Sequence, residues 1–238
     1  MDHAIDLEPG YMSPYGRIYN LSEVELRTLK AFIQTHLASG LFEQSSSPEA
    51  APIIFAKKND GGLRHCVDYR ALNLRIVMYR YLRPLMSELL DRVPGAQICT
   101  ELDLHIAYHL IGIKEGYEYK TAFLTQYGQF EYRVMPFVLT NAPATFQAYI
   151  DDFLKPYIDN LTVCYLDDIL IYSTNEDDHK EHVRKVLERL REFGLYCKAG
   201  KSHFSVSEVG CLGFLMNSEG VGVESDQIST IEDWPTPK

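Results

Sequence analysis

Residues 162–172 read Thr-Val-Cys-Tyr-Leu-Asp-Asp-Ile-Leu-Ile-Tyr, an apolar and β-branched segment with two adjacent carboxylates at its centre. This composition is typical of two short buried strands, so we expect Asp167 and Asp168 at the turn of a hairpin. Carboxylates beside an apolar core are unfavourable unless a cation compensates them. Divalent metal ions with oxygen ligands fit that need, and the segment predicts a metal-dependent catalytic site, with an ordinary turn as the alternative.

A second pair of aspartates, Asp151 and Asp152, has similar neighbours but a different periodicity. Apolar residues here recur three and four positions apart, at Phe146, Tyr149, Ile150, Phe153, Leu154 and Tyr157. The spacing predicts an amphipathic helix with both carboxylates on its solvated face, so we assign them no chemistry. His179 and His182 are likewise expected on the solvent side of a helix rather than at a metal site.

Length and composition describe a chain able to bury a large core. The chain has 238 residues, 46% of them hydrophobic, and its five cysteines contain no Cys-x-x-Cys pair. This predicts neither a zinc site nor a disulfide framework, and it favours a reducing, intracellular compartment. We find no secretory leader and no apolar segment of about 18 residues, so no membrane partner is expected.

The formal net charge of -10 argues at first sight against a nucleic-acid partner. Basic residues nevertheless concentrate between Lys57 and Arg83, where seven of them stand against two acidic residues. Such a local excess can follow a phosphate backbone, although a solvated basic surface explains the same run.

Periodicity and turn signals predict a mixture of helices and strands. Helices are expected over 22–39, where Ser22 opens a capping box, and over 85–93, 142–154 and 176–193. Hairpins are expected over 52–69 and 119–134, and further strands over 98–104, around Phe204 and over 211–216. Helices and strands do not alternate strictly, so the predicted fold class is α+β rather than a doubly wound sheet.

A site of this kind needs a third carboxylate, and Asp103 is the best candidate. It ends the apolar segment 98–104, whose tip could meet the aspartate hairpin. Three carboxylates suit two Mg²⁺ ions, or Mn²⁺, ~3.5–4 Å apart, which activate a 3′-hydroxyl and stabilise the leaving oxygen. Glu101 would face the same side of the strand and stays an adjacent alternative.

Seven short motifs lie, in this order, at 57–64, 67–73, 102–104, 107–108, 141–147, 165–168 and 212–213. Together they closely resemble the reverse transcriptase of gypsy-type LTR retrotransposons. One pair of aspartates arises by chance, whereas seven motifs in the family's order and spacing are specific. The resemblance covers essentially the whole chain.

The resemblance implies a right-hand polymerase fold. An N-terminal extension and helix would occupy 1–40, fingers 41–80 and 111–141, a palm 81–110 and 142–221, and the start of a thumb 222–238. The palm would carry the three aspartates on an antiparallel sheet backed by two helices.

The implied activity is RNA-directed DNA polymerisation, a nucleotidyl transfer that extends a primer with deoxynucleoside triphosphates on an RNA or DNA template. The catalytic and metal-binding residues would be Asp103, Asp167 and Asp168, with magnesium as the cofactor. Ribonuclease H and integrase domains would belong to the full polyprotein but are absent from this chain. The implied location is cytoplasmic, or associated with a particle.

The resemblance also implies binding roles by matching position. Nucleotide binding is implied for Lys58, Arg64, Tyr108 and Gln147. Tyr108 would wall off the 2′ side of the sugar, and Gln147 would lie near the template and the nucleotide. Contact with primer or template is implied for Leu212, Gly213 and Tyr165.

Several positions depart from the family pattern. Val138 stands where the family usually has glycine, and Ser202 where it has cysteine. If position 138 requires a positive φ, a β-branched residue there is strained and nucleotide binding suffers. A catalytically impaired nucleic-acid-binding remnant of the same fold is therefore the alternative function.

Overall fold

The chain folds into two compact units, each assembled from two segments. The computed structural model describes residues 2–57, 62–81, 88, 93, 95–105, 107–158, 160–211, 214–217 and 220–223. Unit 1 comprises Met1–Arg80 and Tyr108–Phe146, and unit 2 comprises Tyr81–Ala107 and Gln147–Lys238. The expected N-terminal extension belongs to unit 1. The names fingers, palm and thumb stay predictions, and residues 224–238 lie outside the described part.

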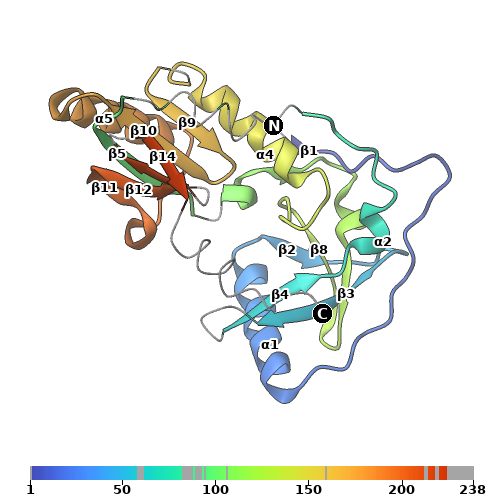
Figure 1. Ribbon diagram of the computed structural model, residues 1–238. Helices are drawn as coiled ribbons and strands as arrows, with labels where there is room; N and C mark the ends of the chain where they lie inside the picture. The colour runs from blue at the N-terminus through green and yellow to red at the C-terminus, as the bar shows by residue number, and fades with distance from the viewer. Residues whose placement is uncertain are drawn as a thin grey trace, which may run out of the picture. The chain divides into compact units, whose positions relative to one another are not determined.

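Unit 1 is built on a five-stranded sheet with the order β2-β8-β7-β3-β4 (Figure 1). The strands are β2 (Phe42–Gln44), β3 (Ala51–Lys57), β4 (Leu63–Val67), β7 (Phe123–Thr125) and β8 (Gly128–Tyr132). β3 pairs in parallel with β7, and the other neighbours pair antiparallel. The β3–β4 pairing confirms the first predicted hairpin.

Helix α1 (Glu23–Ala38) of unit 1 forms where the capping box predicted it. Ser22 is the N-cap, and both reciprocal bonds of the box with Glu25 are present. Gly40, with φ of 71°, follows the helix and ends it. The buried face of α1 carries Leu29 and Ile33, which anchors the helix to the unit.

Smaller elements complete unit 1. They are β1 (Asp2–His3), α2 (Arg70–Asn73), β6 (Gly112–Ile113) and the 3-10 turn η2 (Glu118–Thr121). A further 3-10 turn, η1 (Ala107–Leu110), spans the boundary of the two units. The second predicted hairpin is shorter than 119–134, because Thr121 donates a side-chain hydrogen bond to the Glu118 carbonyl and closes η2 instead.

Unit 2 contains an antiparallel four-stranded sheet with the order β11-β5-β10-β9. Its strands are β5 (Ile98–Asp103), β9 (Thr162–Tyr165), β10 (Asp168–Ser173) and β11 (His203–Val206). A second sheet holds β12 (Glu208–Cys211), β13 (Phe214–Asn217) and β14 (Gly220–Val223). The 3-10 turn η3 (Ala199–Lys201) precedes β11.

Two helices belong wholly or partly to unit 2. Helix α5 (Glu176–Glu192) is capped by Asn175 and packs on β10 and β5. Helix α4 (Ala142–Leu154) contributes its residues from Gln147 onward. The predicted helix at 85–93 falls mostly outside the described residues.

The mixture of elements confirms the α+β class. Among the residues described, no helix is long and apolar enough to cross a membrane.

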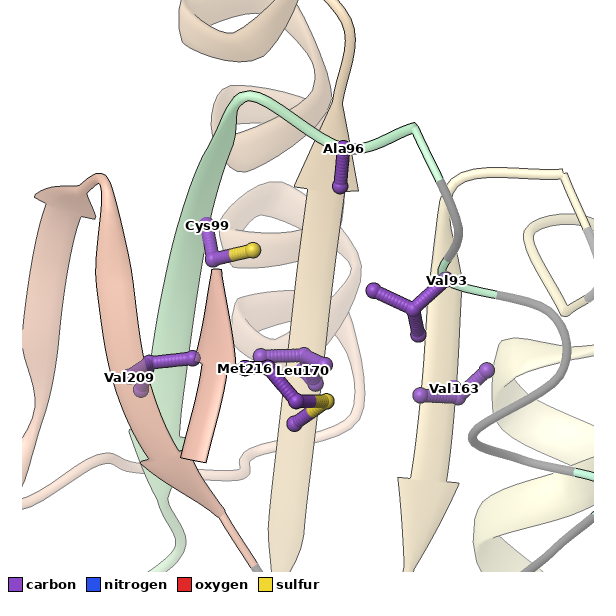
Figure 2. Packing of buried hydrophobic residues seen from close by; sticks show 7 residues of the cluster. All are labelled: Val93, Ala96, Cys99, Val163, Leu170, Val209 and Met216. Carbon is purple, nitrogen blue, oxygen red and sulfur yellow. The ribbon is translucent and has the colours of Figure 1, made fainter. Parts of the chain in front are cut away.

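Alternation along β5, β10 and β9 gives the central sheet of unit 2 two buried faces. One face packs a cluster formed by Val93, Ala96, Cys99, Val163, Leu170, Val209 and Met216 (Figure 2). Leu102, Ile169 and Ile171 alternate with these strand residues and are fully buried on the other face. A sheet packed on both faces holds its strand ends rigidly, and two of those ends carry Asp103 and Asp168.

Candidate functional site

Asp103, Asp167 and Asp168 lie at one end of the central sheet of unit 2. Asp168 begins β10 and Asp103 ends β5, and the two are direct register partners in the antiparallel pair. Side chains that oppose each other directly in such a pair project to the same face. Asp167 lies in the adjoining turn, where its carbonyl accepts a hydrogen bond from the Leu104 amide at 3.0 Å. Glu101 pairs with Leu170, two positions further from the turn.

The electrostatics of Asp168 reflect this crowding. Burial, followed by the negative charges of Asp167 and Asp103, raises the pKa of Asp168 to about 6. Lys201 and Lys198 act in the opposite direction but do not cancel the rise. Burial and the two neighbouring negative charges therefore favour a proton, or another cation, at Asp168.

Lys198 supplies a positive charge directly to Asp103. Its Nζ donates to Asp103 Oδ1 at 2.8 Å, and Lys201 Nζ lies 3.9 Å from Asp103 Oδ2. The backbone amide of Lys198 donates to the Asp103 carbonyl at 2.9 Å. Ser202 Oγ accepts from the Asp103 amide at 3.3 Å, so this departure from the family keeps a polar contact. Sequence reasoning missed Lys198 because 95 residues separate it from Asp103.

The chemistry of the three carboxylates, rather than their arrangement in this structure, fits a divalent cation. In the part of the chain that the structure describes, no three or more acidic, histidine or cysteine side chains are grouped so as to hold a metal ion. The Asp103 carboxylate is instead paired with Lys198. All three residues nevertheless offer carboxylate oxygens, which Mg²⁺ and Mn²⁺ prefer. The pKa of Asp168 is raised by burial and by the charges of Asp167 and Asp103, and a bound cation would offset both effects.

The turn that carries Asp167 has an unusual backbone. Tyr165 and Asp168 are paired, which leaves Leu166 and Asp167 as a two-residue loop, and Leu166 has φ of 55°. The Leu166 amide donates to Oε1 of Gln147 at 2.9 Å. Gln147 is fully buried, and its amide group reaches the turn. Its predicted contact with nucleotide and template stays a prediction.

The remaining predicted site residues fall into three groups. Arg64 on β4 is exposed, and Tyr108 on η1 is half-buried, with its ring stacked on Phe146 at 4.4 Å and 20° between planes. Both belong to unit 1. Tyr165 belongs to unit 2 and packs against the cluster of Figure 2. Those outside the described residues are Lys58, Leu212 and Gly213.

The expected strain at Val138 is absent, which corrects the sequence-based expectation. Within the described residues, Leu166 and Ser205 are the only non-glycine residues with positive φ. The Val138 carbonyl accepts from Asn73 Nδ2 at 2.9 Å, and Asn73 Oδ1 accepts from the Thr140 amide at 2.9 Å. One asparagine side chain thus holds this connection, in which Val138 does not have a positive φ.

Comparison with known proteins identifies the family of this chain. The family profile described as reverse transcriptase (RNA-dependent DNA polymerase) matches residues 56–216, which is more than half of the sequence. The chain belongs to the reverse transcriptase family. Asp103, Asp167 and Asp168 of this reverse transcriptase domain all lie within the matched residues.

Relatives of the reverse transcriptase domain include retrotransposon polyproteins of Schizosaccharomyces pombe. The Transposon Tf2-3 polyprotein is 37% identical over 222 residues, and the Transposon Tf2-7 polyprotein is 36% identical over 222 residues. Each alignment covers 93% of this chain but only 17% of the polyprotein. The predicted membership of a retrotransposon reverse transcriptase family is confirmed.

Solved structures of foamy viral protease-reverse transcriptase share the fold of the reverse transcriptase domain. The complex with an RNA/DNA hybrid matches with a TM-score of 0.87 and 24% identity, over 99% of this chain and 32% of that one. The complex with dsDNA matches with a TM-score of 0.89 and 24% identity, over 100% and 50%. The match confirms the predicted right-hand polymerase fold.

Proposed function

We propose that this chain is an RNA-directed DNA polymerase that extends a primer by two-metal phosphoryl transfer. One observation carries the proposal: Asp103 and Asp168 oppose each other on paired strands, and Asp167 lies in the adjoining turn. Family membership supplies the reaction class. The chain spans 17% of the length of the retrotransposon polyproteins it matches.

Asp103, Asp167 and Asp168 would hold the two magnesium ions, or manganese in their place. When bound, the ions supply positive charge to the entering 3′-hydroxyl, the bridging phosphates and the leaving oxygen. The sheet fixes two of the carboxylates at strand ends, so little reorganisation is required when substrate arrives. Asp168 must be ionised to act, and Lys198 must release the carboxylate of Asp103.

Other residues would bind the nucleotide and the nucleic acid. Arg64 offers a guanidinium suited to bidentate contact with phosphate, and Lys58 a second positive charge. Tyr108, supported by its stack on Phe146, would form the wall beside C2′ of the sugar. The foamy viral relatives were solved with an RNA/DNA hybrid and with dsDNA, which supports a primer on an RNA or DNA template as partner. Ribonuclease H and integrase domains are proposed for the full polyprotein.

Primer extension on an RNA template tests the proposal. With a DNA primer, the four deoxynucleoside triphosphates and Mg²⁺, we expect products of increasing length, and chelation of the metal should abolish them. A chain that binds the primer-template in a gel-shift assay without extending it would instead be the nucleic-acid-binding remnant. The ion pair of Lys198 with Asp103 is the observation that favours this second candidate.

Lys198→Met should tighten divalent metal binding. The ammonium lies 2.8 Å from Asp103 and competes with any metal for that carboxylate, so its removal favours the metal. We expect the apparent Kd for Mn²⁺, measured by isothermal titration calorimetry, to fall by about threefold to tenfold. Lys180→Met is the matched control, because Lys180 pairs with Glu176 at the exposed start of α5. Equal affinity in the two variants would contradict competition by Lys198.

The stability of the metal-free protein should depend on Asp168 between about pH 4 and pH 6. The folded-state pKa of Asp168, about 6, lies above its ordinary value of 3.8, so the folded protein binds the proton more tightly than the unfolded chain. The resulting stabilisation is complete below the ordinary pKa and is lost as pH rises through the folded-state pKa. With metal chelated, the Tm of Asp168→Asn should therefore rise relative to that of the wild type as the pH increases from about 4 to about 6. Parallel curves would show that Asp168 titrates normally.

A further inference from the structure

We infer that Asp151 is a positioning residue that holds the turn carrying Asp167 and Asp168, and that it acts through Gln147. The inference rests on the proposed function, because the turn matters to catalysis only if its carboxylates bind the metal ions. It assigns a role to a residue that sequence periodicity placed on a solvated helix face. All the residues concerned belong to unit 2.

The turn needs an outside restraint. β9 and β10 are joined by Leu166 and Asp167 alone, and Leu166 has φ of 55°. A left-handed backbone is unfavourable for a residue with a bulky side chain, and two-residue hairpin loops commonly place glycine or asparagine there. The hydrogen bond from the Leu166 amide to Gln147 Oε1, at 2.9 Å, supplies that restraint from helix α4.

Asp151 fixes the orientation of the Gln147 amide. Gln147 Nε2 donates to Asp151 Oδ1 at 2.8 Å and approaches the Cys164 carbonyl at 3.5 Å. A carboxylate accepts only from the NH₂ end, which leaves the oxygen end to accept from Leu166. If the amide were reversed, an NH₂ group would face the Leu166 N–H and the oxygen would face the carboxylate. Asp151 thus selects the one orientation that supports the turn.

Asp151 is itself held in place, unlike its neighbour. The Tyr81 hydroxyl donates to Asp151 Oδ2 at 2.8 Å, so both carboxylate oxygens have a partner. Asp151 is half-buried, whereas Asp152 is exposed. Asp152 is exposed on the helix surface, as the sequence predicted. The same prediction is wrong for Asp151, which is half-buried and hydrogen-bonded through both carboxylate oxygens. The two adjacent residues form a matched pair for experiment.

Asp151→Ala should impair catalysis, and Asp152→Ala should not. Alanine keeps the helix but removes the acceptor that orients Gln147. Loss of this buried contact should lower kcat and raise the Mg²⁺ concentration for half-maximal extension, each by about tenfold. Asp151→Asn should retain most activity, because its oxygen can accept from Gln147 and its NH₂ can donate to the Tyr81 hydroxyl oxygen.

The double variant Asp151→Ala/Leu166→Gly separates positioning from general stability. Glycine adopts positive φ without penalty, so the turn no longer depends on the restraint and extension should recover toward the level of Leu166→Gly alone. A loss of stability unrelated to the turn would not be rescued in this way. The rise in Tm on adding Mn²⁺ provides a second measure, which should shrink in Asp151→Ala and not in Asp152→Ala.

Three outcomes would overturn the inference. The first is the same Mg²⁺ dependence and kcat in Asp151→Ala as in Asp152→Ala, and the second is no recovery in the double variant. The third is a wild-type chain that neither extends primers nor gains Tm with Mn²⁺, since the proposed function then fails as well. If the wild type gains Tm without extending primers, the Mn²⁺ shifts of the two alanine variants alone decide between positioning and a bystander role.

Discussion

Asp168→Asn and Asp167→Asn are each expected to lower the rate of primer extension by at least ~100-fold, because each removes a carboxylate that holds the catalytic metal ions. The fold should survive both changes. In Asp168→Asn the neutral side chain replaces a carboxyl whose pKa is already raised to about 6. Steady-state extension with saturating nucleotide and Mg²⁺, together with thermal melting, measures the two effects separately.

Asp152→Asn is the control for these variants. It removes the same charge from an exposed position on helix α4 of the same chain, and its extension rate should stay within about twofold of the wild type. Asp151 does not serve as this control, because it is hydrogen-bonded to Gln147. Comparable losses at Asp152 and at the turn would contradict the assignment of the site.

Tyr108→Ala should weaken discrimination against ribonucleotides. If the ring forms a wall beside C2′, its removal makes room for a 2′-hydroxyl, and the preference for deoxyribonucleotides, expressed as a ratio of kcat/KM values, should fall by about tenfold or more. Tyr108 is half-buried and stacked on Phe146 at 4.4 Å, so alanine also lowers stability. A loss of stability alone would reduce incorporation of both sugars alike.

Tyr108→Phe provides the control for the sugar prediction. It keeps the ring and the stack on Phe146 while removing the hydroxyl, so discrimination by a steric wall should be preserved. A folded Tyr108→Ala protein with unchanged discrimination would remove Tyr108 from the nucleotide site.

Elements governed by local signals were predictable from the sequence. Ser22 and Glu25 form the capping box of α1, and the 3.6-residue period set α4 over Ala142–Leu154 as expected. That Asp103 could meet the aspartate hairpin was also predicted, because Asp103 lies at the tip of an apolar strand, and Asp103 and Asp168 are indeed register partners. In each case the information lies within one element.

Contacts between distant segments were not predictable in the same way. His179 was expected on the solvent side of α5 but is fully buried, with Nε2 2.7 Å from Thr100 Oγ1 and Nδ1 2.9 Å from Ser173 Oγ. Polar partners on β5 and β10 make that burial tolerable, and helical periodicity does not reveal them. Lys198 escaped notice for the same reason. Asp151 left only a weak signal, its spacing of four residues from Gln147 on one helix.

Gln147 shows that a sequence motif can identify a family while the structural role of one of its residues stays unpredicted. Its position within 141–147 identified the family resemblance, whereas its hydrogen bonds to Leu166 and Asp151 depend on the left-handed turn. Positive φ at a leucine has no signature in the sequence, because glycine or asparagine is the residue that usually marks it.

Counting bound metal ions tests the central claim most directly, namely that Asp103, Asp167 and Asp168 together form a two-metal polymerisation site. Mn²⁺ binding would be followed by electron paramagnetic resonance, with a chain-terminated primer on an RNA template and the next deoxynucleoside triphosphate present. We predict about two Mn²⁺ ions per wild-type complex and loss of at least one in Asp103→Asn and in Asp168→Asn, with Asp152→Asn unchanged. An unaltered number of ions in a variant lacking all three carboxylates would contradict the account.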